Sequence, residues 1–225
     1  MRWFEWLMAA ILVIIAAVAL ASDISGGIFP WYMMLLSFTT KLCIIACLFL
    51  TAKACILNFH LAILRNLTFA TFGIIAEMHA GELTGQFIVL PLFIFVPIEI
   101  ISWVLWAKNK DEQEKWRAKV RSLTPIKNAV TAIIILGIPC IIAYMFDSFS
   151  WYRGFYLAVI IASPVLLMLR YREHYIWSFI PLLVPFFSVE AISSVAPLEL
   201  IDQVITLIVM ALGFANWVKL SKSNG

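Results

Sequence analysis

The residues best able to do chemistry lie close together, just before a charged loop. Glu99 is followed four residues later by Trp103 and seven residues later by Trp106, in an apolar run that begins at Pro97. On a helix these three side chains project from roughly one face. An acid beside two aromatic rings is a contact surface for a flat or cationic organic molecule. The alternative is that the tryptophans are anchors at a membrane boundary and that Glu99 pairs with a neighbouring helix.

The composition places these residues in a membrane. Hydrophobic residues make up 64% of the 225 residues and charged residues only 13%, with a mean hydropathy of +1.00. Soluble domains are roughly half apolar and a quarter charged. Apolar stretches of about 20 residues, long enough to span a bilayer, recur along almost the whole chain. The protein is therefore an integral membrane protein without room for a separate soluble domain, and its net charge of +3 gives no indication of nucleic-acid binding.

The apolar stretches divide into eight predicted membrane spans, so the expected fold class is all-α integral membrane. Their predicted bounds are residues 3–21, 33–52, 54–77, 83–106, 127–146, 151–170, 174–194 and 199–218. Residues 1–22 also resemble a signal peptide. An apolar run of about 18 residues and two tryptophans, Trp3 and Trp6, favour instead an additional N-terminal transmembrane helix that is retained.

Positive charge gathers on one side of these spans. Thirteen of the 16 Lys and Arg residues fall there, six of them in a charged loop at 107–126, and only Arg153 falls on the other side. Lys41 and Arg65 lie within spans. By the positive-inside rule, this bias predicts that both termini are cytoplasmic. We expect a multi-pass protein of the bacterial inner (cytoplasmic) membrane.

The predicted orientation reveals an internal repeat. A first three-helix repeat at 33–106 and a second at 151–218 cross the membrane in the same sense, so they are parallel. A linker helix at 127–146 follows the cytoplasmic loop at 107–126 and joins them. Each repeat ends with a small residue four positions before a tryptophan, at Ser102 and Trp106 and at Gly213 and Trp217. Parallel repeats of three, one and three helices are a transporter design, with the binding site near the midplane between the halves.

Polar residues within the spans are candidates for that site. His60 and Arg65, beside Asn58 and Asn66, give the third span a polar face that either lines a cavity or bonds neighbouring helices. Pro91 lies inside the fourth span, where it removes a backbone hydrogen bond and predicts a kink. Kinked helices suit alternating access by rocking of one bundle against the other.

A set of short motifs resembles the PnuC family of vitamin B3 (nicotinamide riboside) transporters over roughly residues 33–219. The motifs are Ala52-Lys53, Asn58, Gly81-Glu82, Pro97, the Trp103 and Trp106 pair, Lys119 to Thr124, Leu169 to Glu173, and Gly213 with Trp217. The resemblance implies a SWEET-like 3+1+3 fold, a homotrimer and transport by facilitated diffusion. It also implies a cytoplasmic kinase that traps the substrate by phosphorylation.

Several polar positions depart from the family pattern. Glu99 stands where the family usually has an amide, Ser102 where it has glycine, and Arg65 where an asparagine is common. In the second repeat an aspartate is replaced by Arg153, a glutamine by Pro164 and a tryptophan by Tyr175. The chain therefore resembles a divergent member, whose substrate can differ from nicotinamide riboside.

These observations predict a transporter of a small aromatic or cationic vitamin-like metabolite, with nicotinamide riboside as the first candidate. Thiamine and a deoxynucleoside are the alternatives, and a non-transporting membrane binding subunit is the alternative class. The predicted substrate-binding residues are Glu99, Trp103, Trp106, Asn58, Asn66 and Tyr175, with the aromatic rings stacking on the substrate. We expect neither an enzyme nor a cofactor or metal site, because the chain shows no converging nucleophile or metal-ligand set.

Overall fold

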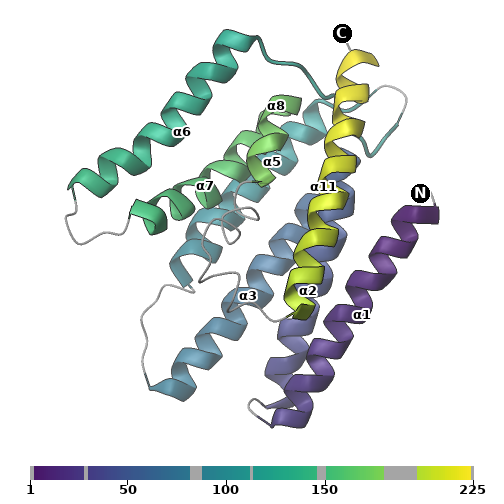
Figure 1. Ribbon diagram of the computed structural model, residues 1–225, viewed down its shortest axis with the longest axis vertical. Coiled ribbons are helices and arrows are strands. Elements are labelled where there is room, and N and C mark those ends of the chain that lie inside the picture. Colours follow the sequence, from purple (N-terminus) through teal and green to yellow (C-terminus); the bar gives the residue numbers. More distant parts are fainter. Residues whose placement is uncertain are drawn as a thin grey trace.

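The computed structural model describes residues 3–27, 30–81, 88–111, 114–145, 151–179 and 197–223. Within these ranges the regular elements are helices, as the composition predicts (Figure 1). Five of them are long and apolar enough to cross a membrane. Many of their large apolar side chains are exposed, as expected where lipid tails surround a helix.

The first half of the chain supplies four of these five helices. They are α1 (Trp3–Gly26), α2 (Trp31–Ala52), α3 (Asn58–Ala80) and a continuous helix made of η1 (Val89–Phe95) and α5 (Val96–Lys108). Helix α3 ends at Gly81, which adopts φ +73° in the left-handed region that glycine enters without steric cost.

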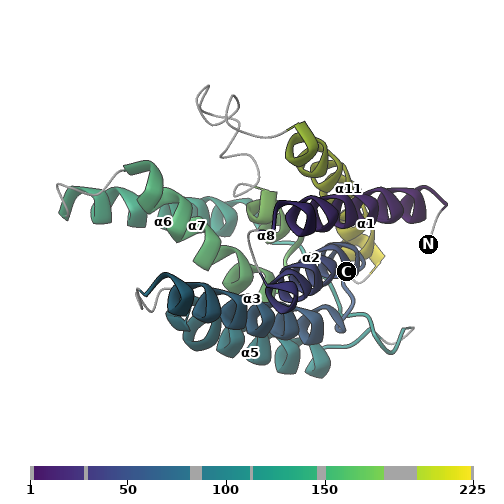
Figure 2. The same ribbon diagram turned by 90° about the horizontal axis from the view of Figure 1, so that it is seen from below.

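The second half begins after a loop that forms isolated β-bridges through Lys110, Arg117, Ala118 and Arg121. It contains α6 (Pro125–Met145), α7 (Trp151–Met168), α8 (Arg172–Tyr175), η2 (Ile176–Phe179) and the long α11 (Pro197–Ser223). Helices α6 and α7 pack side by side and project away from α1 (Figure 2). Most of the seventh predicted span, 174–194, lies outside the described residues.

Helix packing brings one end of several helices together. Helix α3 packs between α2 and α5, α5 also packs on α7, and α11 packs on α2. Helix α1 lies against α2 and α11. The start of α1 and the ends of α2, α5, α7 and α11 therefore share one end of the molecule, toward the N and C labels in Figure 1. We call this the basic end, because Lys53, Lys108, Arg170 and Lys219 belong to it.

One helix bound and one helix interior differ from the predicted spans for identifiable backbone reasons. Helix α3 begins at Asn58 rather than at residue 54, because Ala54 adopts φ +51° in a tight turn that interrupts the helical path. In η1, the N–H of Val96 bonds to the carbonyl of Pro91, five residues back. This wider π-helical turn accommodates the ring of a proline that cannot donate a backbone hydrogen bond.

Three clusters of buried side chains hold the helices together within the described residues, the smallest being Val159 and Leu166 of α7. One lies at the basic end and contains Phe59, Trp106, Tyr175 and Trp217, none of them more than 3% exposed. Another joins α1 to α2 and α11 through Met8, Leu12, Phe49 and Val209. Since lipid tails are as apolar as these side chains, the clusters stabilise the bundle through close packing.

Candidate functional site

Helix α3 turns a stripe of small and amide side chains toward its neighbours. The buried residues of this helix recur every three or four positions, which is the period of one helix face: Asn58, Phe59, Ala62, Asn66, Ala70, Gly73 and Glu77. Asn58 Nδ2 donates to Thr51 Oγ1 of α2 at 2.8 Å, and the Cys47 thiol donates to the carbonyl of Asn58. Of the predicted polar face, the two asparagines are therefore directed into the protein, whereas Arg65 is half-buried and His60 is exposed.

Each amide keeps one polar atom without a hydrogen bond. Within the described part of the chain, Asn58 Oδ1 and Asn66 Nδ2 are both buried and have no hydrogen-bond partner. The Ser102 hydroxyl on α5 is in the same condition and is completely buried. Buried polar atoms are normally paired, so an acceptor and donors of this kind mark a place where a ligand or water can bind.

Glu99 pairs with Arg65 across the α3–α5 interface. Arg65 Nη2 lies 3.5 Å from Glu99 Oε1 and also 3.5 Å from Asn66 Oδ1, so one guanidinium group joins the amide to the acid. Glu99 is 7% exposed, and the Arg65 side chain is half-buried. The pair joins two of the three residues at which the first repeat departs from the pattern of the family that it resembles. The positive charge of Arg65 therefore offsets the negative charge of Glu99. This is the alternative considered from the sequence, in which Glu99 pairs with a neighbouring helix.

We refer to Asn58, Arg65, Asn66, Glu99 and Ser102 as the polar cluster. Arg65 contacts Asn66 of α3 and Glu99 of α5, and Ser102 lies one turn after Glu99. Asn58 lies eight residues before Asn66, about 12 Å away along α3, so the cluster is elongated along the helix. Charged groups inside a membrane helix are costly unless they pair or face a polar cavity. An arrangement with one acid, one base and two amides can bind a small polar molecule that carries both hydrogen-bonding groups and charge.

Trp103 does not share the buried face of Glu99 and Trp106. A helix advances by about 100° per residue, so Trp106 lies about 20° to one side of Glu99 and Trp103 about 40° to the other. The buried residues Glu99, Ser102 and Trp106 occupy the first side, whereas Trp103 is 38% exposed. Its ring packs edge-on against His60 at 4.9 Å. The structure thus brings Glu99 together with Asn66 but leaves Trp103 at the margin.

Trp106 and Tyr175 lie deep at the basic end rather than beside the ion pair. Trp106 is completely buried, with its ring edge-on to Phe59 at 4.8 Å, and Tyr175 packs on Trp217 at 5.0 Å. The two tryptophans are themselves 5.7 Å apart. In this conformation both predicted stacking residues are covered by protein.

The contacts of the two tryptophans mirror each other. The indole N–H of Trp106, at the end of α5, donates to the carbonyl of Leu167 near the end of α7. The indole N–H of Trp217, near the end of α11, donates to the carbonyl of Thr51 near the end of α2. Three residues after each acceptor the chain turns at a residue with positive φ. The last helix of each predicted three-helix repeat therefore bonds to the first helix of the other predicted repeat, α5 to α7 and α11 to α2.

A strap formed by residues 114–124 covers this core. The N–H of Ala118 donates to the carbonyl of Ala54, and the N–H of Arg121 donates to the carbonyl of Arg170. Among the residues that the structure describes, Ala54 and Arg170 are the two non-glycine residues with positive φ, at φ +51° and +61°. The strap thus pairs with the turn that follows α2 and with the matching turn that follows α7. Sequence reasoning missed this role, although its signal was present in the equal spacing of Ala54 to Phe59 and of Arg170 to Tyr175.

Comparison with known proteins gives a family and a fold. The family model described as nicotinamide mononucleotide transporter matches residues 34–219. The crystal structure of the vitamin B3 transporter PnuC matches with a TM-score of 0.72 and 19% sequence identity, covering 100% of this chain and 94% of that chain. No curated protein matches the chain in sequence. At this identity the structural likeness shows the fold, whereas the family match spans most of the sequence.

Proposed function

The chain belongs to the nicotinamide mononucleotide transporter family, and we propose that this membrane transporter carries nicotinamide riboside by facilitated diffusion. The family resemblance predicted from the short motifs is confirmed, and so is the prediction of a transporter rather than an enzyme. The substrate, the binding residues and the finer topology are part of the proposal.

The observation that carries the substrate proposal is the polar cluster. Nicotinamide riboside combines a pyridinium cation, a carboxamide and ribose hydroxyls. Glu99 supplies an anion for the cation, Asn58 Oδ1 is an available acceptor, and Asn66 Nδ2 is an available donor. Trp103 contributes an aromatic face at the margin of the cluster. Trp106 and Tyr175 contact the substrate in our proposal only when the strap has moved away from the basic end.

The pairing of Glu99 with Arg65 favours one alternative substrate. A neutralised acid attracts a cation less strongly than a free one, whereas two amides and a hydroxyl serve an uncharged nucleoside equally well. A deoxynucleoside is therefore the second candidate. Thiamine is a cation like nicotinamide riboside, so its uptake tests whether the site needs a positively charged substrate.

We propose eight spans in a SWEET-like 3+1+3 arrangement of parallel repeats with one additional N-terminal helix. The mirrored indole bonds to Leu167 and Thr51 support it, because they relate 33–106 to 151–218. The shared basic end supports cytoplasmic termini in the bacterial inner membrane. We further propose a homotrimer and a cytoplasmic kinase that traps the substrate. Mass measurement in detergent tests the trimer.

Uptake by proteoliposomes tests the substrate proposal. Labelled nicotinamide riboside, thiamine and deoxyuridine are supplied outside vesicles that contain the purified protein, with empty vesicles as the blank. We expect nicotinamide riboside to equilibrate across the membrane. If none of the three compounds enters above the blank, the substrate proposal is wrong. If only deoxyuridine enters, the second candidate replaces the first.

Variants of the acid test the site. Glu99→Gln leaves Arg65 unpaired and should weaken the affinity for a cationic substrate about tenfold or more, equivalent to about 1.4 kcal/mol. The double variant Arg65→Gln with Glu99→Gln removes the repulsion and should recover part of the affinity. Glu199→Gln on the exposed start of α11 is the matched control and should transport normally. Unchanged transport by Glu99→Gln would assign Glu99 a structural role.

A further inference from the structure

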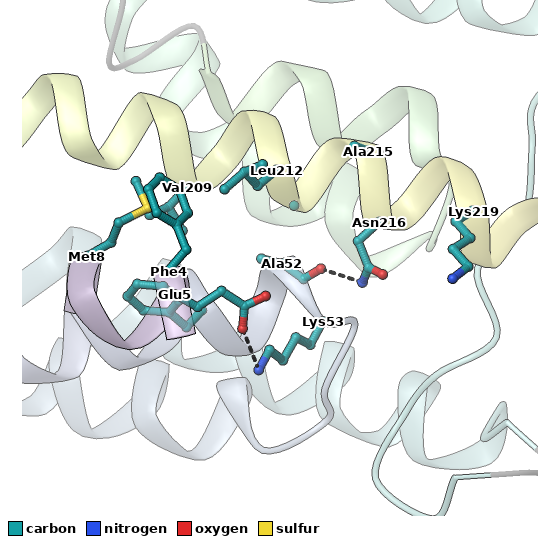
Figure 3. Close-up of a pocket in the computed structure, with 12 residues that line it drawn as sticks. Phe4, Glu5, Met8, Ala52, Lys53, Val209, Leu212, Ala215, Asn216 and Lys219 are labelled. Atoms are coloured by element: carbon teal, nitrogen blue, oxygen red, sulfur yellow. Dashed lines mark hydrogen bonds and ion pairs between the residues drawn. The ribbon is translucent and has the colours of Figure 1, made fainter. Parts of the chain in front are cut away.

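A cavity lies apart from the polar cluster. It has a volume of about 400 Å³ and lies between α1, α2 and α11 at the basic end (Figure 3). None of the polar-cluster residues lines it. All three helices line it, with Glu5 and Met8 from α1, Lys53 after α2, and Leu212, Asn216 and Lys219 from α11. The volume lies within the range of roughly 300–1,000 Å³ that is common for small-molecule sites.

One end of the cavity is polar and carries excess positive charge. Lys53 Nζ pairs with Glu5 Oε2 at 3.1 Å, and Asn216 Nδ2 donates to the carbonyl of Ala52 at 2.9 Å. Figure 3 shows Lys219 beyond Asn216 on the same helix. Lys219 is exposed, and within the described residues it forms no ion pair. Because Glu5 offsets only Lys53, one positive charge on the rim remains available to an anion.

The opposite side of the cavity is apolar. Its wall is formed by Phe4 and Met8 from α1, Phe49 from α2, and Val209 and Leu212 from α11. Phe4 and Leu212 are about two-fifths exposed, so this wall also opens toward the surroundings of the helices. An apolar wall below a basic rim matches the two parts of a phospholipid, which has an acyl chain below a phosphate.

Small residues keep the space open. Ala52, Gly213 and Ala215 all line the cavity. At Gly213, α11 approaches α2 so closely that a Cβ atom would collide with Ala52 and with the Tyr175 hydroxyl. Helix α1 is held in place by packing of Met8 on its neighbours and by the Glu5 ion pair. The gap between α1 and α11 therefore follows from the packing of the helices.

We propose that this cavity binds a phospholipid with a net negative headgroup. Its phosphate lies beside Lys219 and the amide of Asn216, and one acyl chain follows Met8 and Leu212. Basic pockets between helices at a membrane surface attract anionic headgroups. Free phosphate gains nothing from the apolar wall, and a zwitterionic lipid places a second cation near Lys219. The anionic lipid is therefore the occupant that satisfies both ends of the cavity.

Lipid titration in a nonionic detergent tests this site on the full-length protein. Native mass spectrometry measures binding of dioleoylphosphatidylglycerol, with dioleoylphosphatidylcholine and inorganic phosphate as comparison ligands. Lys219→Ala should weaken binding of the anionic lipid about fivefold, since one lysine near the headgroup contributes about 1 kcal/mol. The matched control is Lys222→Ala, at the exposed end of the same helix but outside the cavity, which should change binding by less than about twofold.

A second variant separates the cavity from general surface charge. Leu212→Trp fills the apolar wall while every lysine remains, and it should abolish the tightly bound lipid. Equal effects of Lys219→Ala and Lys222→Ala, or unchanged lipid binding by Leu212→Trp, would overturn the proposal. Equal binding of the zwitterionic lipid, or displacement of the lipid by millimolar phosphate, would overturn it as well.

Discussion

Removing one member of the Arg65–Glu99 pair should destabilise the protein more than removing both. Each single change leaves a charged side chain inside the bundle without its partner, and such uncompensated charges are costly. The double change to glutamines leaves neutral amides, which is the residue class usual in the family at position 99. The stability effects of the two substitutions should therefore be strongly non-additive.

The geometry sets the size of this coupling. Two unit charges separated by 3.5 Å attract each other by about 5 kcal/mol at an effective dielectric constant of about 20. The side chain of Arg65 is 30% exposed, and screening reduces that value. Polar contacts between membrane helices also contribute little, averaging about 0.6 kcal/mol with a maximum of about 1.7 kcal/mol. We therefore expect a coupling free energy of about 1–3 kcal/mol.

Thermal unfolding in detergent measures the coupling in a double-mutant cycle of Arg65→Gln and Glu99→Gln. If each single variant loses about the coupling free energy, it should lower the unfolding midpoint by roughly 2–12 °C, at about 2–4 °C per kcal/mol for a chain of this length. The double variant should lie closer to the parent protein. Glu114→Gln, which breaks an exposed ion pair with Arg117, is the control and should shift the midpoint little. Effects that add within about 0.5 kcal/mol would refute the coupling.

Three further predictions concern the frame around the site. Trp217→Phe should lower the free energy of unfolding by about 1–2 kcal/mol and Trp106→Phe by less. The reason is that Trp217→Phe loses a hydrogen bond of 2.7 Å, whereas Trp106→Phe loses one of 3.3 Å. Equal shifts of the unfolding midpoint would contradict this order. Gly213→Ala should destabilise the protein by several kcal/mol, because the added Cβ would collide with α2. In Gly137→Ala the added Cβ meets open space, so this control should be neutral or stabilising in the same unfolding assay. A single cysteine at Lys222, in a background without the natural cysteines, should react with an impermeant maleimide only after the cytoplasmic side is opened; labelling from the periplasm would contradict the proposed orientation.

The all-helical fold could be predicted because hydropathy and charge act over long stretches of sequence. A span of about 20 apolar residues has few alternatives to a membrane helix. Local departures from regular helix geometry were harder to predict from the sequence. The left-handed turn at Ala54 is imposed by pairing with the strap, and the π-helical turn at Pro91 depends on how that helix is packed. Neither has a distinctive local signature in the sequence.

The candidate site could be predicted only in part, because its decisive contact is tertiary. Arg65 and Glu99 were each visible as departures from the family pattern, but their pairing requires α3 and α5 to be neighbours in a fixed register. Trp103 was grouped with Glu99 by helical spacing. Residues four apart lie about 40° from each other around a helix. The boundary between the buried and the exposed side of α5 falls between Glu99 and Trp103. Tyr175 was predicted to contact substrate, and its burial against Trp217 depends on the packing of α8 on α11, which is again a tertiary contact.

Counterflow in proteoliposomes tests the central claim most directly. Vesicles loaded with unlabelled nicotinamide riboside are diluted into a trace of labelled compound, without a pH gradient or membrane potential. A facilitative transporter exchanges the two pools, so the label should rise transiently inside and then fall, with a smaller rise for Glu99→Gln. Entry of label at the rate of empty vesicles, with no transient rise, would contradict the account.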